Sequence, residues 1–330
     1  MIRRHRYRAV ATALAMLSAA ALAACGSSSS SSSSKSTAAA PTSSTATNGS
    51  PAAAASGPGV GKPPVTVGDK NFEEEFVLGS LYAQALAAKG YKVTVKGNIG
   101  SSEITYKALK AGQIDMYPEY TGTLLSAVAG VTTPPHSAQQ AYAEAKAFAE
   151  KNGFTLLDQT PFYDSDALGA LKAYAQAHGL TSDADLKKLG KSVKLGGAPE
   201  FATRYEGLIG LKKAYGDNPT FVPLAIGLTY KALDTGQVQV SDVFTTDPQL
   251  TTHKYVVLVD PKKIFGFQNV APIVSKKVVA AEGPAFADTI NKVSALLTIP
   301  AIQKMNAAVA LDQQSPDAVA RQFLQANGLL

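Results

Sequence analysis

The sequence predicts an α/β fold of two lobes built on one plan, with a ligand cleft between them. The main observation is an internal repeat, because residues 105–121 return as residues 229–245, and both copies carry Thr-Tyr-Lys-Ala-Leu followed by Gly-Gln. The copies lie about 124 residues apart, far beyond the roughly 20–50-residue period of solenoid repeats. A repeat of this length indicates two similar lobes.

Each copy of the repeat predicts a helix followed by a strand. The apolar spacing favours a helix that stops at Gly112 or Gly236, and a short strand then covers 114–116 or 238–240. Open α/β sheets bind ligands beyond the carboxyl ends of their strands. We therefore expect ligand contacts from the polar and aromatic residues that follow the two strands. These candidates are Tyr117, Glu119, Tyr120, Ser241, Asp242 and Phe244.

Residues 1–25 predict a lipoprotein signal peptide with a lipobox. A basic start precedes a small apolar run over 9–24, which leads to Leu-Ala-Ala-Cys at Cys25, and this order of segments is typical of an export signal. The run is shorter than the about 20 residues of a spanning helix. We expect Cys25, the only cysteine of the chain, to be lipidated and to anchor the protein to the membrane outside the cytoplasm.

Composition divides the rest of the chain into a tether and a globular part. Residues 26–64 are rich in Ser, Ala, Thr, Gly and Pro and nearly free of large apolar side chains, so we expect a disordered tether. The globular part, residues 65–330, is long enough to form two lobes of modest size, each with its own core. We assign 65–165 plus 270–330 to lobe I and 166–269 to lobe II. A single cysteine allows no disulfide within the chain.

Charge and motifs exclude several functional classes. The formal net charge is +6, but four arginines leave with the signal peptide, so the mature chain carries +2. The body has no basic cluster interleaved with aromatic residues, so no nucleic-acid partner is expected. The four histidines are isolated, which gives no metal-ligand spacing. The chain also lacks the nucleophile elbow, phosphate loop and dinucleotide turn, so we expect a non-enzymatic protein without cofactors.

The predicted elements of lobe I alternate between strand and helix. We expect a strand at 65–70, a helix from 71 to about 89 and a second strand at 91–95. The helix of the first repeat follows a turn at 98–103, where a serine caps the helix or bonds the ligand. An Ala-rich helix over 138–151 and a strand at 154–157 come next. A polar loop at 160–166 then begins the first crossing between the lobes.

The elements of lobe II lead to a second crossing. We expect a short helix capped near Thr181, a strand at 192–197, a helix from Pro199 and, after the second repeat, a strongly β-branched strand at 255–259. The chain then returns to lobe I at 270–274. Residues 283–330 are predicted to be helical, and Ser315-Pro-Asp is typical of a capped helix start.

Four motifs resemble the substrate-binding lipoproteins of osmoprotectant ABC importers, which take up glycine betaine, choline, carnitine and related quaternary amines. The motifs are Lys-Asn-Phe-Glu-Glu-Glu-Phe from Lys70, the block from Gly100 to Thr123 with Met-Tyr-Pro-Glu-Tyr-Thr-Gly-Thr, Pro-Glu-Phe-x-x-Arg from Pro199, and Gly-Leu-Thr-Tyr-Lys-Ala-Leu from Gly227 through Asp247. The resemblance covers residues 65–330. It implies a type II periplasmic-binding-protein fold with two crossing strands that closes on its ligand like a hinge, importer permease subunits as partners, and a monomer.

The family encloses the ammonium group of its ligand in a tyrosine cage drawn from four places. By the resemblance, Tyr117 and Tyr230 match two of them. Asp166 and Gln268 stand at the other two, where the family commonly has aromatic side chains. The remaining candidate ligand contacts are Glu75, Ser101, Ser102, Asp164, Asn71 and Thr246.

Asp166 and Gln268, which replace aromatic residues of the cage, affect which solute we expect to bind. An aromatic face attracts a cation by about 0.5–2 kcal/mol, and a carboxylate pairs well with a buried charge. We therefore expect a cation held partly by Asp166, with Glu75 and Asp164. A zwitterion such as glycine betaine also needs donors for its own carboxylate. Choline, or a larger cationic or zwitterionic solute such as ergothioneine, is at least as good a candidate as betaine.

Several residues and functions have alternative interpretations. For Tyr106 and Tyr120 we expect core packing, which is also the alternative for Tyr117 and Tyr230. Arg204 and Asp247 are either cleft residues or a structural ion pair near the hinge, and we favour the ion pair. Within binding proteins, the alternative is an exported sensor or scaffold with the same cleft. An exported hydrolase or transferase with Glu119, Asp166 or Asp247 as acid and base is a third possibility, and a purely structural surface protein is a fourth.

Overall fold

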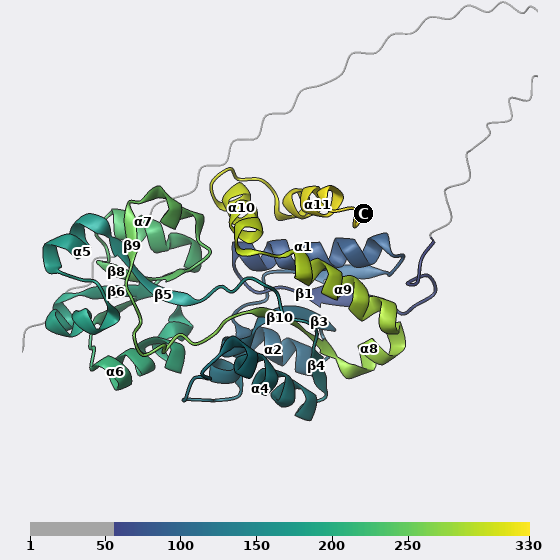
Figure 1. The fold of residues 1–330 in the computed structure, drawn as a ribbon, viewed down its shortest axis with the longest axis horizontal. Helices are drawn as coiled ribbons and strands as arrows, with labels where there is room; N and C mark the ends of the chain where they lie inside the picture. Colours follow the sequence, from purple (N-terminus) through teal and green to yellow (C-terminus); the bar gives the residue numbers. More distant parts are fainter. Residues whose placement is uncertain (1–55) are drawn as a thin grey trace, which may run out of the picture. The chain divides into compact units, whose positions relative to one another are not determined.

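The computed structural model describes residues 56–330, which contain two mixed five-stranded sheets (Figure 1). The predicted signal peptide, Cys25 and most of the predicted tether lie outside the described residues. The first sheet has the order β2-β1-β3-β10-β4 and the second the order β7-β6-β8-β5-β9. We call each sheet with its helices lobe I and lobe II, respectively.

Lobe I is built from both ends of the described chain. Its strands are β1 (Val65–Gly68), β2 (Val93–Lys96), β3 (Met116–Tyr120), β4 (Phe154–Leu156) and β10 (Val270–Ser275). Its helices are α1 (Glu73–Ala88), α2 (Ser102–Lys110), α3 (Thr121–Thr123) with a π-helical continuation at Leu124–Val128, α4 (Ala138–Lys151), α8 (Lys276–Glu282), α9 (Pro284–Leu296), α10 (Ile299–Ala310) and α11 (Pro316–Ala326). Each strand and helix predicted for this lobe is present, with ends shifted by a few residues.

Lobe II contains shorter elements. Its strands are β5 (Asp166–Leu171), β6 (Lys194–Gly197), β7 (Thr220–Pro223), β8 (Val240–Phe244) and β9 (Tyr255–Val257). Its helices are α5 (Lys172–His178), α6 (Gly210–Tyr215) and α7 (Thr229–Asp234), joined by 3-10 turns at Asp183–Lys188, Gly190–Ser192, Pro199–Ala202, Ile226–Leu228 and Pro248–Thr252 and a π-helical segment at Tyr205–Ile209. The helix predicted from Pro199 is therefore broken into several short pieces.

The internal repeat corresponds to the same helix-to-strand unit in both lobes. In lobe I it is α2 followed by β3, and in lobe II it is α7 followed by β8; β3 and β8 are the middle strands of their sheets. Gly112 and Gly236 follow the helix ends with φ of 67° and 70°, a left-handed conformation that glycine adopts without strain. The prediction of two lobes with one plan is confirmed.

The two repeat strands begin later than predicted, at residues 116 and 240 instead of 114 and 238. The antiparallel ladder explains the difference in lobe I, because the pairing of β3 with β10 starts at Met116 opposite Val274. Residues expected just beyond the strand, Tyr117 and Tyr120 among them, therefore lie within β3.

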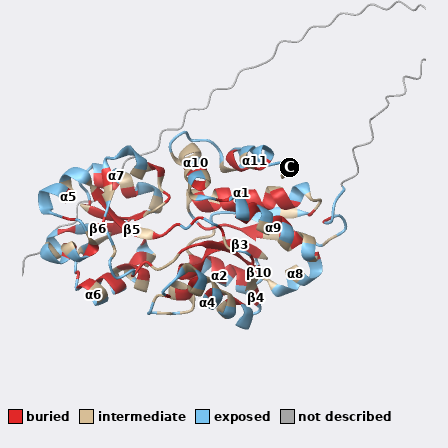
Figure 2. Ribbon diagram, viewed as in Figure 1, coloured by how far each residue is buried: buried red, intermediate tan, exposed pale blue. Residues whose placement is uncertain are grey.

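Period-two alternation along β3 separates its two tyrosines. Successive side chains of a strand point to opposite faces of the sheet. Met116 and Tyr120 pack with α1, α9, α10 and α11 on one face, whereas Tyr117 packs with α2 and α4 on the other. Figure 1 shows these helices on the two sides of the first sheet, and Figure 2 shows that the sheets are the most buried layer.

Two antiparallel segments connect the lobes. The first precedes β5 and the second precedes β10; they pair through a bridge between Tyr163 and Asn269, and Asp164 N donates to Gln268 O at 3.1 Å. Asn269 Nδ2 donates to Thr160 O and Phe162 O at 3.0 Å each. The two crossing strands implied by the resemblance are present.

The start of the described chain packs on lobe I. Residues 56–64 fall in the range predicted as tether, and there Gly59 N donates to Lys89 O at 3.0 Å. At the other end, the Ser315 hydroxyl accepts from Ala318 N at 3.2 Å and caps α11 as predicted. Among residues 56–330, no single helix is long and apolar enough to cross a membrane, and only the bent pair of α9 and α10 would pass that test together.

Replacing Gln268 by Leu should lower the free energy of unfolding by about 2 kcal/mol. Gln268 is buried; its Oε1 accepts from Thr123 N at 2.9 Å and its Nε2 donates to Glu206 Oε2 at 2.9 Å. Leucine would leave both partners without a bond. Chemical denaturation measures the change, and Gln325→Leu, on an exposed position of α11, is the matched control. Equal stability of the two variants would contradict the structural role of Gln268.

Candidate ligand-binding site

A pocket of about 50 Å³ lies between the lobes and takes side chains from both. We call it pocket 1. Lobe I contributes the loop after β1, the start of α2 and the end of β3, while lobe II contributes β5, β8 and the turns after β6 and β7. The carboxyl ends of β1, β3, β6 and β8 therefore face this pocket, as open α/β sheets are expected to arrange a ligand site.

Aromatic rings form the apolar walls of pocket 1. Phe72 stacks on Phe244 across the two lobes with ring centroids 5.5 Å apart, and Phe72 lies 6.1 Å from Tyr120. Phe201 of lobe II completes the set. Rings from opposite lobes thus meet at pocket 1, and their remaining surface can contact an apolar or cationic group beside them.

Four carboxylates, Asp164, Asp166, Glu200 and Asp242, also line pocket 1. Asp166 and Asp242 lie on the neighbouring strands β5 and β8, which pair in the sheet. Burial raises the pKa of Asp166 to about 6, although Arg204 opposes the shift. Burial and the neighbouring Asp166 raise the pKa of Asp242 well above its ordinary value. Without a nearby cation, the ionised carboxylates of Asp166 and Asp242 are therefore less stable than they would be in water.

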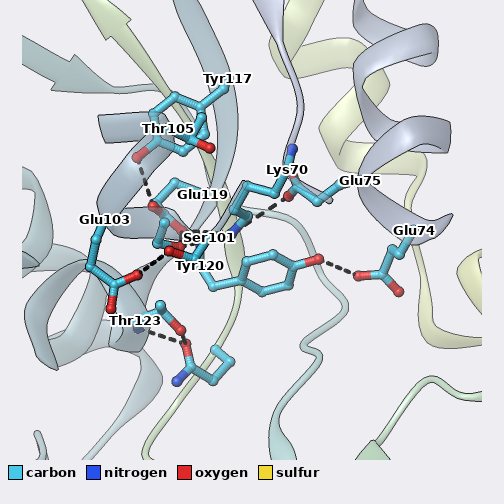
Figure 3. A network of polar contacts seen from close by, with 12 residues as sticks. Lys70, Glu74, Glu75, Ser101, Glu103, Thr105, Tyr117, Glu119, Tyr120 and Thr123 are labelled. Carbon is cyan, nitrogen blue, oxygen red and sulfur yellow. Dashed lines mark hydrogen bonds and ion pairs between the residues drawn. The ribbon is translucent and has the colours of Figure 1, made fainter. Parts of the chain in front are cut away.

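Lys70 is held within lobe I by a buried polar network (Figure 3). Its Nζ donates to Glu119 Oε1 at 2.8 Å and to Ser102 Oγ at 3.2 Å. The same ammonium lies 4.1 Å from the centroid of the Tyr120 ring. One aromatic face of pocket 1 is therefore already in contact with a cation of the protein.

Arg204 joins the lobes on another side of pocket 1. Its Nε and Nη2 bond to the two carboxylate oxygens of Glu103 at 2.9 and 2.8 Å, and Ser101 Oγ donates to Glu103 Oε2 at 2.6 Å. Burial raises the pKa of Glu103, but the bonds from Arg204 outweigh it and hold that pKa at about 2. This bidentate pair fastens lobe II to the start of α2.

Glu74 at the start of α1 makes a second connection. Its carboxylate accepts from Tyr120 Oη at 2.6 Å, from Thr246 Oγ1 at 2.7 Å and from Asn306 Nδ2 at 2.7 Å. Thr246 follows β8 of lobe II and Asn306 belongs to α10. Glu74 thereby links the aromatic wall of pocket 1 to a second cavity.

That second cavity, pocket 2, has a volume of about 140 Å³. It shares Phe72, Asp164, Ile226, Asp242 and Phe244 with pocket 1, so the stacked Phe72–Phe244 pair stands between the two. Tyr230 and Thr246 line pocket 2 only. Tyr230 Oη donates to Asp247 Oδ2 at 2.7 Å.

The candidate contacts divide into three groups by location. Asn71, Ser101, Ser102, Asp164 and Asp166 line pocket 1, whereas Tyr230 and Thr246 line pocket 2 and Asp164 belongs to both. Tyr117, Glu75 and Gln268 line neither pocket.

Tyr117, Glu75 and Gln268, which line neither pocket, instead bond to other groups of the protein. The Tyr117 ring is fully buried in the lobe I core, and its hydroxyl donates to Glu119 Oε2 at 2.7 Å. Glu75 is buried and accepts from Lys70 N at 3.1 Å. Gln268 ties the second crossing segment to both lobes. The strand alternation of β3 places Tyr120, three residues from Tyr117, at the pocket.

Two expectations from the sequence change at this site. Tyr120 packs in the core as expected, but its ring also lines pocket 1. The expected ion pair between Arg204 and Asp247 was wrong, because Arg204 bonds Glu103 and Asp247 accepts from Tyr230. The alternative fits better, since Arg204 lines pocket 1 and Asp247 lines pocket 2. Phe72, Phe201 and Lys70 were not selected as contacts. The motifs contained them, but only the meeting of loops from both lobes identifies which side chains face the pocket.

The Glu103–Arg204 pair should make stability depend on pH below about 4.5. The folded pKa of Glu103 is about 2, below its ordinary value of 4.5, so the pair contributes fully above pH 4.5 and is lost as pH falls toward 2. The difference in Tm between wild type and Glu103→Gln should shrink over that range. Glu150→Gln, on an exposed position of α4, is the control. A Tm difference independent of pH would contradict the role of this pair.

The acids around the pockets do not form a metal-binding cluster. Within residues 56–330, no group of three or more His, Cys, Asp or Glu side chains is arranged to hold a metal ion. Pocket 1 instead combines apolar rings, acids and two basic side chains around one small cavity, a lining that suits an organic ligand.

The chain matches known proteins over most of its length. A family model described as the substrate binding domain of ABC-type glycine betaine transport systems matches residues 63–326. A glycine-betaine-binding protein of Pseudomonas aeruginosa is 33% identical over 276 residues, which cover 80% of this chain and 88% of the relative. The ergothioneine transport permease/ergothioneine binding protein EgtU of Helicobacter pylori is 28% identical, and the match covers 81% of this chain and 48% of that protein.

Solved structures agree with the fold. A glycine betaine/carnitine/choline ABC transporter structure is 26% identical, with a TM-score of 0.64, and the match covers 80% of this chain and 99% of that one. Apo YehZ of Escherichia coli is 27% identical, with a TM-score of 0.56 and coverage of 81% and 99%. The predicted two-lobed type II periplasmic-binding-protein fold is confirmed. The chain belongs to the family of substrate-binding domains of ABC-type glycine betaine transport systems.

Proposed function

We propose that this chain is the extracytoplasmic solute-binding lipoprotein of an ABC importer and captures a quaternary-ammonium solute in pocket 1. The observation that carries the proposal is the composition of that pocket, in which rings and carboxylates from both lobes surround one small space. Named relatives bind glycine betaine, carnitine and ergothioneine. Each of these solutes carries a quaternary ammonium group.

The cation would lie between the aromatic rings and the acids. Phe72 and Phe244 present ring surface that attracts an ammonium without hydrogen bonds, whereas a face of Tyr120 already contacts Lys70. Asp166 and Asp242 supply negative charge from the side of lobe II. Because a quaternary ammonium cannot donate hydrogen bonds, rings and unbonded charge suit it better than a set of carbonyl groups would.

The balance of charge favours a cation over a zwitterion. The lining of pocket 1 contains Lys70 and Arg204 as cations against four acids: Asp164, Asp166, Asp242 and Glu200. Both cations are already paired, Lys70 with Glu119 and Arg204 with Glu103. A zwitterion would have to compete for these partners, so we propose that pocket 1 prefers a cationic group, as choline carries, over a zwitterion.

Solute capture and transport would proceed by closure of the lobes. The crossing segments supply the hinge, and a solute that contacts rings and acids of both lobes stabilises the closed arrangement. The closed form would then dock on the importer permease. Lipidation at Cys25 would keep the monomer at the membrane beside it. The chain performs no chemistry on the solute in this mechanism and needs no cofactor.

Asp166→Asn should weaken choline binding about tenfold, close to 1.4 kcal/mol, because it removes a charge and keeps the shape. A thermal-shift series with choline, glycine betaine, carnitine and ergothioneine, followed by calorimetry, measures the effect on the full-length chain. Asp312→Asn, on an exposed turn, is the control.

The same variants test pH dependence. Burial raises the pKa of Asp166 to about 6, while Arg204, Asp242, Glu200 and Lys70 surround it. A bound cation favours the ionised carboxylate, so choline affinity should rise as pH increases through about 6, and less so in Asp166→Asn. If none of the four solutes binds, the proposed function is overturned. If wild type and Asp166→Asn bind choline with equal affinity, Asp166 is not part of the binding site.

A further inference from the structure

Pocket 2 adjoins the proposed solute site and differs from it in size and charge. It is almost three times larger, at about 140 against 50 Å³. Any inference about pocket 2 rests on the proposed function, since it concerns a solute that already occupies pocket 1. The Phe72–Phe244 pair forms a wall common to both cavities, so an elongated molecule that occupies both must run beside this pair.

The ionisable side chains that line pocket 2 include five acids and no basic group. The acids are Glu73, Glu74, Asp164, Asp242 and Asp247, and no lysine, arginine or histidine is among the lining residues. Burial raises the pKa of Asp247 to about 7, with Glu74 and Glu73 adding to the shift. Burial likewise raises the pKa of Glu74. A cation in this cavity would stabilise the ionised form of each acid.

An unpartnered acceptor provides the second observation. Asn306 is 5% exposed, and its Oδ1 has no hydrogen-bond partner. Its orientation is determined by Glu74, because Nδ2 donates to Glu74 Oε2 at 2.7 Å; the free end of the amide is therefore the oxygen. Two more lining oxygens lack partners, namely Oδ1 of Asp242, which is 7% exposed, and Oε1 of Gln249.

Free acceptors identify the kind of cation. A quaternary ammonium has no N–H group and would leave these oxygens unsatisfied, whereas a protonated amine carries donors for several of them. Asn306 and Ala310 also belong to the last turns of α10, and the carbonyl end of a helix carries partial negative charge. Both features suit a compact alkylammonium group.

We propose that pocket 2 is a subsite for a protonated amine, and that the preferred solute carries such an amine on a chain extending from the quaternary ammonium in pocket 1. Glu74 couples the two groups, since it accepts from Asn306 in pocket 2 and from Tyr120 in pocket 1. The solute class is thus an elongated organic dication.

Matched probes separate this proposal from the function of pocket 1. Calorimetry on the full-length chain compares (4-aminobutyl)trimethylammonium with butyltrimethylammonium, which differs only by the terminal amine, and repeats the comparison with propyl, pentyl and hexyl chains. The amine should improve affinity at least about tenfold, or 1.4 kcal/mol, at the best chain length. Gln249→Leu and Asn306→Leu should reduce that ratio toward one and change butyltrimethylammonium binding little. Gln303→Leu, elsewhere on α10, should keep the ratio.

The outcomes are distinguishable. Binding of the alkyl probes with no gain from the amine at any length would overturn the subsite and leave the proposed function standing. A gain that survives both Gln249→Leu and Asn306→Leu would also overturn it. Failure of every alkyl probe and of choline to bind would contradict the proposed function itself. Because Gln249 is only half-buried and its Oε1 has no hydrogen-bond partner, its variant remains informative where Asn306→Leu unfolds the chain.

Discussion

Burial of acidic side chains where the two lobes meet is the constraint on which the rest of the structure depends. Glu74, Asp164, Asp166 and Asp242 lie there with raised pKa values that burial causes. Such groups are costly unless protons, donors or cations compensate for the lost water. The protein supplies donors to Glu74 through Tyr120, Thr246 and Asn306, and leaves part of Asp242 unpaired. A bound cation would complete the compensation and simultaneously draw the lobes together.

The duplicated plan explains why these acids converge. The middle strands β3 and β8 both end at pocket 1, and each follows a helix that glycine terminates. Around that frame the lobes differ. Lobe I holds its lysine in a buried network with Glu119, while lobe II sends Arg204 across to Glu103. Two cations of the protein are thus engaged in structural pairs, so the remaining charge around the cleft is negative and favours a positive solute.

The elements and their order could be predicted from the sequence, because helix stops, strand periodicity and the long repeat are local signals. The repeat even included Tyr120, Asp242 and Phe244 among the candidates. What local signals could not decide was which face of β3 meets the second lobe, and so Tyr117 was preferred to Tyr120. Nor could they pair Arg204 with Glu103, which lies about 100 residues earlier and meets it only across the cleft. Motif residues such as Tyr230 and Thr246 line part of pocket 2, but α10 supplies its remaining wall from far along the chain, and no motif indicated that helix.

The most direct test of the central claim is a comparison of choline with 3,3-dimethyl-1-butanol, its uncharged carbon isostere, by calorimetry. Both molecules have nearly the same size and shape, so apolar burial is matched and only the positive charge differs. If rings and carboxylates of pocket 1 hold a cation, choline should bind at least about 100-fold more tightly, which corresponds to roughly 2.7 kcal/mol. Equal affinities would show that the cleft recognises shape without charge, and would contradict a cation site in pocket 1.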